Sequence, residues 1–159
     1  MKKTILDIKA IIFDWGRTLY DVDNKQEISD SEDVLLYCKQ KGYKMCVASL
    51  ARPLTGDNVE ERRKQIENSS LYKYLDMLEV SDVKEKDEML DNLVTKLNIL
   101  KTEILFVDDR VVKSIKYGNK NGHPTVWLKS GSFANELHNS ETGTPTFIIE
   151  TLSELKNLI

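Results

Sequence analysis

Asp14 is the first residue of this sequence whose type and position could do chemistry. It follows four apolar residues, 10–13, a run typical of a strand that is buried on both faces. Open α/β sheets bind their ligands at the carboxyl ends of such strands. A carboxylate there could bind a metal ion, act as a nucleophile or do both, and Thr18 offers a hydroxyl just beyond it. The alternative is that Asp14 only ends a strand and begins a turn.

Other predicted strands also end in polar side chains. Ser49 follows a short apolar run, and Asp108 and Asp109 follow another. Lys86 stands at the start of a predicted helix between them, with Lys84 as a second candidate. Because the carboxyl ends of parallel strands meet at one edge of a sheet, we expect these groups to converge.

Such a cluster would suit phosphoryl chemistry. Two or three carboxylates can hold a hard cation such as Mg²⁺. Ser49 and a lysine could bind phosphate oxygens, and Asp14 could attack phosphorus in line while the metal offsets the repulsion between two anions. The alternatives for Ser49 and Lys86 are a helix cap and a solvated lysine.

The elements that would position these residues alternate along the chain. We expect a loop or small hairpin over 19–28, then strands separated by helices. The expected strands are 10–13, 45–48, 77–80, 104–107, 125–128 and 146–149, and the expected helices lie near 29–42, 59–68, 84–97, 111–120 and 152–159. This alternation predicts one α/β domain over 1–159, a Rossmann-like, doubly wound parallel sheet with right-handed crossovers.

Composition narrows the class of function. The 159 residues carry a net charge of -3, which does not favour general nucleic-acid binding through a basic face. No apolar run is long enough to span a membrane. Cys38 and Cys46 stand in apolar segments, so we expect buried, inert thiols and a cytoplasmic location.

Three further features have no expected role in the site. His123 and His138 lack a partner at metal-ligand spacing, and we expect them on the surface or in loops. The basic run 62–64 is expected to form a solvated helix face, and Lys113 is expected to be a solvated helix residue.

Taken together, the motifs resemble those of the haloacid dehalogenase superfamily of phosphohydrolases. That family's first motif is an apolar strand followed by Asp-x-Asp-x-Thr, which here reads Asp14-Trp15-Gly16-Arg17-Thr18. The second is a strand ending in Ser or Thr, here Ser49. The third is a lysine ahead of a helix, here Lys86, and the fourth is a strand ending in Asp108-Asp109. The resemblance covers essentially the whole chain.

The resemblance implies a Mg²⁺-dependent phosphatase that works through an aspartyl-phosphate on Asp14. Asp14, the main-chain carbonyl of Gly16 and Asp109 would bind the metal. Asp108 would either ligate it or hold a metal-bound water.

The same resemblance implies a binding site for a phosphorylated small molecule or macromolecule. Ser49 and Lys86 would bind the phosphoryl group, and Lys86 would also offset the crowded carboxylates. Thr18 would support the loop or bond the phosphate. Arg17 stands where the family usually has glycine, and it could either clamp a substrate anion or point to solvent.

Two departures from the family pattern put turnover in doubt. Gly16 replaces the second Asp, which serves as general acid and base, and Lys113 stands where an acidic residue is often found. The rival hypotheses are a phosphate- and metal-binding or regulatory module without turnover, and a phosphotransferase with a long-lived phosphoenzyme.

The spacing of the motifs leaves no room for a cap domain. About 35 residues separate Asp14 from Ser49, and a similar number separates Ser49 from Lys86, which is too few for an extra domain. Capless members of the family act on large substrates or close their sites with a neighbouring subunit, so a homo-oligomer is one option here.

Overall fold

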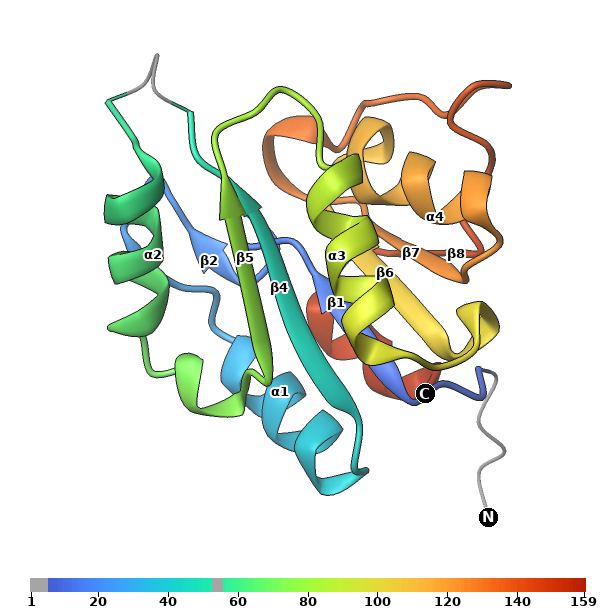
Figure 1. Cartoon of the computed structure of the whole chain (residues 1–159), viewed down its shortest axis with the longest axis horizontal. Helices are drawn as coiled ribbons and strands as arrows, with labels where there is room; N and C mark the ends of the chain where they lie inside the picture. Colours follow the sequence, from blue (N-terminus) through green and yellow to red (C-terminus); the bar gives the residue numbers. More distant parts are fainter. Residues whose placement is uncertain (1–5, 53–55) are drawn as a thin grey trace.

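Six parallel strands form the centre of the molecule, for which we analysed a computed structural model that describes residues 6–52 and 56–159. Their order in the sheet is β5-β4-β1-β6-β7-β8 (Figure 1). The strands are β1 (Ala10–Phe13), β4 (Lys44–Leu50), β5 (Met77–Ser81), β6 (Ile104–Asp108), β7 (Thr125–Leu128) and β8 (Phe147–Ile149). Each neighbouring pair is parallel, as the alternation of strands and helices predicted.

The strand order reverses beside β1. The chain places β4 and β5 on one side of β1 and then crosses to lay β6, β7 and β8 on the other. Phe13 pairs with Val47 of β4 and with Val107 of β6, so the residues that follow Phe13 and Val107 lie at the same level. Ligands of doubly wound sheets bind at the carboxyl ends of strands where the order reverses, which here is the gap between β1 and β6.

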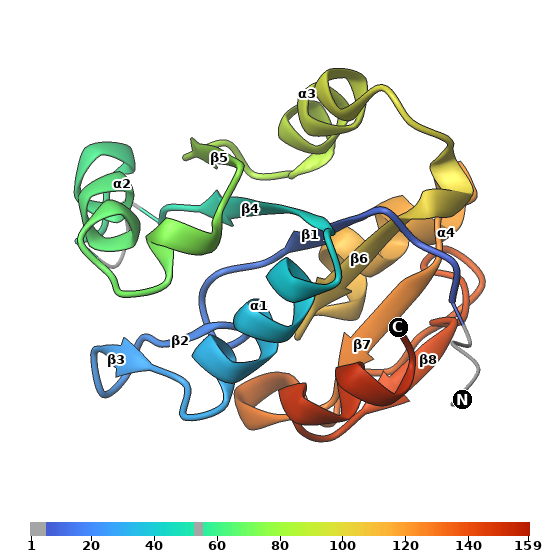
Figure 2. The same ribbon diagram turned by 90° about the horizontal axis from the view of Figure 1, so that it is seen from below.

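Helices cover both faces of the sheet and make three layers (Figure 2). One face packs against α1, α2 and a C-terminal 3₁₀ helix, and the other against α3 and α4. The helices are α1 (Ser31–Gln40), α2 (Val59–Glu67), α3 (Asp87–Leu97) and α4 (Lys116–Asn121), with 3₁₀ turns at Tyr72–Tyr74, Lys101–Glu103, Gly131–Phe133 and Leu152–Asn157 and a π-helical turn at Val111–Ile115.

Side-chain alternation along β1 explains why both faces are covered. Ile11 and Phe13 join one hydrophobic cluster, Ala10 and Ile12 join the other, and all four are fully buried. A strand that is apolar on both sides requires a layer of helices on each. Gly118 brings α4 close to the sheet, because a Cβ there would lie only 2.5 Å from Thr125 Cγ2.

The expected hairpin is also present. β2 (Tyr20–Asp21) and β3 (Gln26–Glu27) pair antiparallel beside the loop that follows β1. Within the described residues, no second domain is inserted between the motifs, in line with a capless fold. The predicted domain also includes 1–5 and 53–55, which lie outside the described residues.

Other predictions had different outcomes. Cys38 and Cys46 are free and buried, as expected. His123 lies in the loop between α4 and β7, one of the two expected places, but it is buried there: the residue is 6 % exposed, and Nδ1 lies 2.8 Å from the Lys101 carbonyl oxygen. Among the described helices, none is long and apolar enough to cross a membrane.

Candidate active site

Asp14 directly follows β1 and begins a tight turn. Its main-chain N–H donates to the Val107 carbonyl oxygen at 2.9 Å, which ties the residue to the end of β6. In the turn, the Trp15 carbonyl accepts from the N–H groups of residues 18, 19 and 20. The Thr18 hydroxyl donates to Asp14 Oδ2 at 3.3 Å, so Thr18 supports the carboxylate from within the turn.

Asp108 ends β6, Asp109 follows it directly, and both are buried. Asp108 Oδ1 accepts from the Arg110 N–H at 2.9 Å, and Asp108 Oδ2 accepts from the Ser114 N–H at 3.0 Å. The Asp109 carbonyl accepts from Trp127 Nε1 at 2.9 Å, but Asp109 Oδ2 is buried without a hydrogen-bond partner in the described part of the chain. Asp108 is therefore held by the backbone, whereas Asp109 has an oxygen to spare for a ligand.

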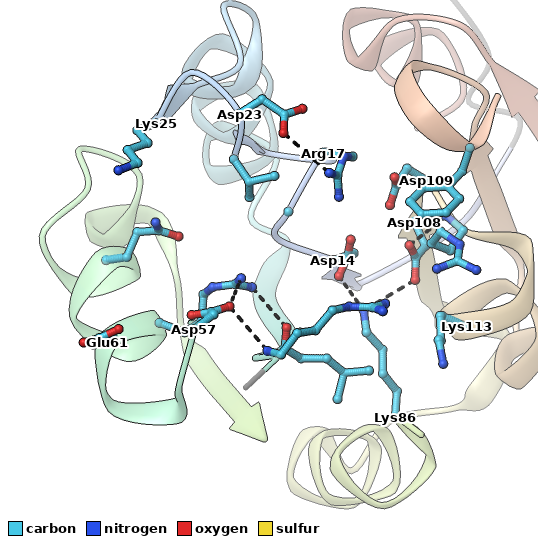
Figure 3. Close-up of a pocket in the computed structure, with 18 of the residues that line it drawn as sticks. Asp14, Arg17, Asp23, Lys25, Asp57, Glu61, Lys86, Asp108, Asp109 and Lys113 are labelled. Atoms are coloured by element: carbon cyan, nitrogen blue, oxygen red, sulfur yellow. Dashed lines mark hydrogen bonds and ion pairs between the residues drawn. The ribbon is translucent and has the colours of Figure 1, made fainter. Parts of the chain in front are cut away.

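Lys86, immediately before α3, joins the carboxylates. Its Nζ lies 2.5 Å from Asp14 Oδ1 and 3.4 Å from Asp108 Oδ2, and its side chain is 4 % exposed (Figure 3). Lys84 is exposed, so only Lys86 of the two candidate lysines contacts Asp14.

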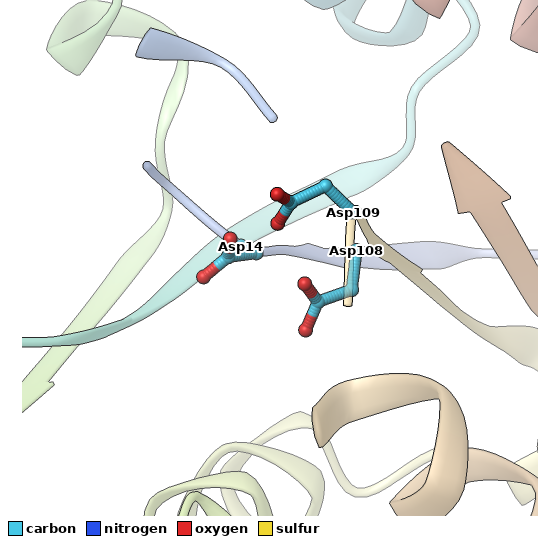
Figure 4. Close-up of side chains that lie close together, drawn as sticks. All are labelled: Asp14, Asp108 and Asp109. Carbon is cyan, nitrogen blue, oxygen red and sulfur yellow. The ribbon is translucent and has the colours of Figure 1, made fainter. Parts of the chain in front are cut away.

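Three carboxylates at the ends of the neighbouring strands β1 and β6 lie close together (Figure 4). One oxygen from each of Asp14, Asp108 and Asp109 lies within 4.8 Å of the others. Burial, together with the charges of Asp14 and Asp108, raises the pKa of Asp109 to about 9. Burial and Asp108 also raise the pKa of Asp14, against the opposing effect of Lys86. Burial works against ionisation of Asp108 too, but Lys86 and the hydrogen bonds of residues 110 and 114 outweigh it and lower its pKa.

These residues fit a hard divalent cation. All the donors are oxygens, which Mg²⁺ prefers, and close carboxylates repel one another unless a cation lies between them. The unpartnered Asp109 Oδ2 is an oxygen that such an ion would satisfy.

A pocket of about 660 Å³ opens over the carboxylates. Asp14, Gly16 and Arg17 of the first motif line it, as do Lys86 and Lys113. Among the described residues, the cationic side chains that line it are Arg17, Lys25, Arg52, Arg62, Lys86, Arg110 and Lys113. An anionic group can therefore find several positive partners beside the three acidic residues.

Two predicted site residues lie behind the pocket wall rather than in it. Thr18 and Ser49 are buried, and neither lines the pocket, although Leu50 does. The Ser49 hydroxyl accepts from Arg62 Nη1 at 2.7 Å.

Arg62 corrects the prediction that the run 62–64 is a solvated face. Its side chain is only 12 % exposed, pairs with Asp57 and also donates to the Leu50 carbonyl at 3.2 Å. The sequence did hold a signal for this placement. Ile66 is buried one helical turn later on the same face of α2, and residues four apart on a helix are neighbours.

Lys113 is also less exposed than predicted. Its side chain is 14 % exposed, donates to the Lys84 carbonyl at 3.1 Å and lies 3.6 Å from Glu85. It therefore fastens the segment ahead of Lys86 to the turn after β6, and it lines the pocket rather than facing bulk solvent.

A family model described as HAD-hydrolase-like matches residues 83–155, the segment that contains Lys86 and both carboxylates of β6. Over this segment the chain resembles the haloacid dehalogenase superfamily. This match and the fold support a hydrolase. No curated protein matches the chain by sequence.

Solved structures of several proteins share the fold at low sequence identity. The HAD-hydrolase YfnB of Bacillus subtilis, determined with bound magnesium, superposes with a TM-score of 0.78 at 13 % identity, covering 95 % of this chain and 98 % of that one. An uncharacterised protein of Listeria monocytogenes serotype 4b superposes with a TM-score of 0.73 at 20 % identity, covering 93 % of this chain and 94 % of that one. The core domain of a Streptococcus pneumoniae protein described as a phosphoglycolate phosphatase superposes with a TM-score of 0.67 at 12 % identity. The match covers 97 % of this chain and 96 % of that one. These likenesses show the fold.

Proposed function

We propose that this protein is a Mg²⁺-dependent phosphohydrolase that works through an aspartyl-phosphate on Asp14. The observation that carries the proposal is the contact of Lys86 Nζ with both Asp14 and Asp108, beside a third carboxylate with a free oxygen. One cation inside a cluster of three acids, two of them buried, leaves negative charge for a metal ion to neutralise.

Asp14, Lys86 and Thr18 have separate roles in the proposed reaction. An Asp14 oxygen attacks phosphorus, the bond from phosphorus to the ester oxygen breaks, and the departing oxygen takes a proton from water. A second water then attacks the aspartyl-phosphate, which releases phosphate and restores Asp14. Lys86 and the Thr18 hydroxyl hold the Asp14 carboxylate in place, and Lys86 also binds the transferred group.

Mg²⁺ would be held by Asp14, Asp109 and the Gly16 carbonyl, with Asp108 ligating or holding a bound water, and it would neutralise the negative charge of the phosphoryl group. The YfnB structure with magnesium supports this choice of ion. The site would accept the phosphoryl group of a small molecule or a macromolecule.

Gly16 favours a second candidate function. It lines the pocket without a side chain that could transfer a proton, and a general acid or base typically contributes on the order of 10²–10⁴-fold. A phosphotransferase fits this absence, because slower attack by water gives a long-lived phosphoenzyme, and a binding module that has lost turnover needs no such group.

The first experiment is phosphate release from p-nitrophenyl phosphate with and without Mg²⁺. We expect turnover that EDTA removes and that disappears in Asp14→Asn. Asp33→Asn, an exposed carboxylate on α1, is the matched control and should keep full activity. Mg²⁺ binding without turnover would contradict the hydrolase. A labelled phosphoryl group trapped on Asp14 would then indicate the phosphotransferase, and the absence of a labelled phosphoenzyme would indicate the binding module.

A further inference from the structure

Arg17 occupies a backbone position that suits glycine. Its φ is 63°, in the left-handed region, and its N–H donates to the Tyr20 carbonyl at 2.7 Å. The turn requires this backbone conformation, but it does not require an arginine side chain. Residues kept in such conformations cluster at functional sites, where the side chain has a role that offsets the strain.

The arginine side chain extends over the pocket near Asp14 (Figure 3). Its guanidinium carbon lies 5.7 Å from the centre of the Phe133 ring, and the guanidinium carbon of Arg110 lies 3.8 Å from the same centre. Arg110 is fixed in turn by Glu136, whose carboxylate accepts from Arg110 Nε at 2.9 Å. An aromatic ring and a second arginine therefore shape a cationic wall beside the carboxylate cluster.

Arg17 differs from neighbouring pocket cations in how it is neutralised. Lys86, Arg62 and Arg110 each pair with a carboxylate whose side chain is at most 22 % exposed. The Arg17 partner is Asp23, at 3.6 Å and 71 % exposed, and such surface pairs are weak. Arg17 Nε is also buried without a hydrogen-bond partner among the described residues. Its positive charge is thus available to a ligand.

We propose that Arg17 selects substrates that carry a second anionic group, a carboxylate or a further phosphate, near the phosphoryl group. This inference rests on the proposed function, because Asp14 and Lys86 would hold the phosphoryl group while Arg17 meets the second anion. Arg17 is three residues from Asp14, and both line the same pocket, so one short molecule can reach both. A guanidinium suits either anion, since both accept paired hydrogen bonds.

The test measures binding with phosphonates, whose carbon–phosphorus bond resists hydrolysis, so it does not depend on turnover. The three probes are propylphosphonate, 3-phosphonopropionate and 1,3-propylenediphosphonate, titrated calorimetrically into the full chain with Mg²⁺. We expect at least one of the two probes with a second anion to bind about tenfold more tightly than propylphosphonate. Whichever binds more tightly identifies the carboxylate or the phosphate as the second anion.

Two variants test whether Arg17 is responsible. Arg17→Met and Arg17→Gly should each remove the preference, and the glycine variant suits the positive φ, so it should fold even if methionine does not. Lys120→Met removes an exposed positive charge on α4, outside the residues that line the pocket, and should keep the preference. A preference that survives in the Arg17 variants, or no preference or no binding in the natural chain, would overturn the inference. Selective binding without turnover of p-nitrophenyl phosphate would contradict only the hydrolase.

Discussion

Replacing Gly16 by aspartate should increase phosphatase activity, because it supplies a carboxylate where related phosphatases carry their general acid and base. Gly16 is not among the described residues with positive φ, so an L-amino acid can adopt its backbone conformation. A Cβ there would lie 3.3 Å from Val22 Cγ1, a few tenths of an ångström closer than an ordinary contact. This atom is the end of the Val22 side chain, in the turn that joins β2 to β3, so it can shift.

The expected gain in transition-state stabilisation exceeds the expected loss of folding stability. Mild overpacking of this kind costs about 1 kcal/mol of stability. A positioned acid and base accelerates turnover on the order of 10²–10⁴-fold, which corresponds to about 3–5 kcal/mol of transition-state stabilisation. The folded protein should therefore tolerate Gly16→Asp, and its kcat should rise by at least about 10²-fold on esters with poor leaving groups.

The assay compares an alkyl ester, glycerol 3-phosphate, with p-nitrophenyl phosphate. An alkoxide needs a proton to leave, whereas p-nitrophenolate does not, so the gain should be larger for the alkyl ester. Gly16→Asn is the matched control, because it has the same shape but cannot transfer a proton. If Gly16→Asp keeps its Tm and Mg²⁺ affinity and shows the kcat of Gly16→Asn, the missing carboxylate does not limit turnover and the reasoning is refuted.

Two further predictions concern buried ionisable groups. Lys86→Met should lower the free energy of unfolding by about 3 kcal/mol in urea titrations, because it leaves Asp14 and Asp108 without their buried cation. Lys84→Met should change the free energy of unfolding little. Equal effects of the two substitutions would contradict the conclusion that Lys86 is the lysine paired with these carboxylates. Burial lowers the pKa of His123 below its usual 6.5, since the ring packs on Phe106. The unfolded chain therefore binds a proton at His123 that the folded chain excludes. The contribution of His123 to stability is complete above pH 6.5 and falls below it, with a slope of at most about 1.4 kcal/mol per pH unit. Urea titrations from pH 8 to pH 5 should show that the free energy of unfolding falls less steeply in His123→Asn than in the natural chain. Identical slopes of stability against pH would rule out His123 as the cause.

Much of the fold follows from local sequence. The apolar runs that become β1 and β6 are long enough only for strands, and each ends at an acidic residue. Parallel strands share an edge for their carboxyl ends, so strand ends alone predict that Asp14, Asp108 and Asp109 lie together, as they do. Short motif spacings likewise predicted a domain without a cap.

The pocket walls did not follow in the same way. Arg62 and Lys113 look like ordinary charged helix residues in sequence, yet each is tied to a distant segment, to Ser49 and to the Lys84 carbonyl. His123 carries no pattern that marks it as buried, and its burial depends on how the turn after α4 folds back on Phe106. Such contacts join residues far apart in the chain, so local periodicity cannot reveal them.

The sequence by itself determined the sheet, the acidic cluster and the absence of a general acid at Gly16, because these depend on residue type and on strand ends. Only the tertiary structure decided that Lys86 rather than Lys84 contacts Asp14, and that Arg17 stands with Phe133 and Arg110. The physical reason is that a side chain several bonds long can reach more than one neighbour. Which neighbour it meets is set by the packing of loops from opposite ends of the chain.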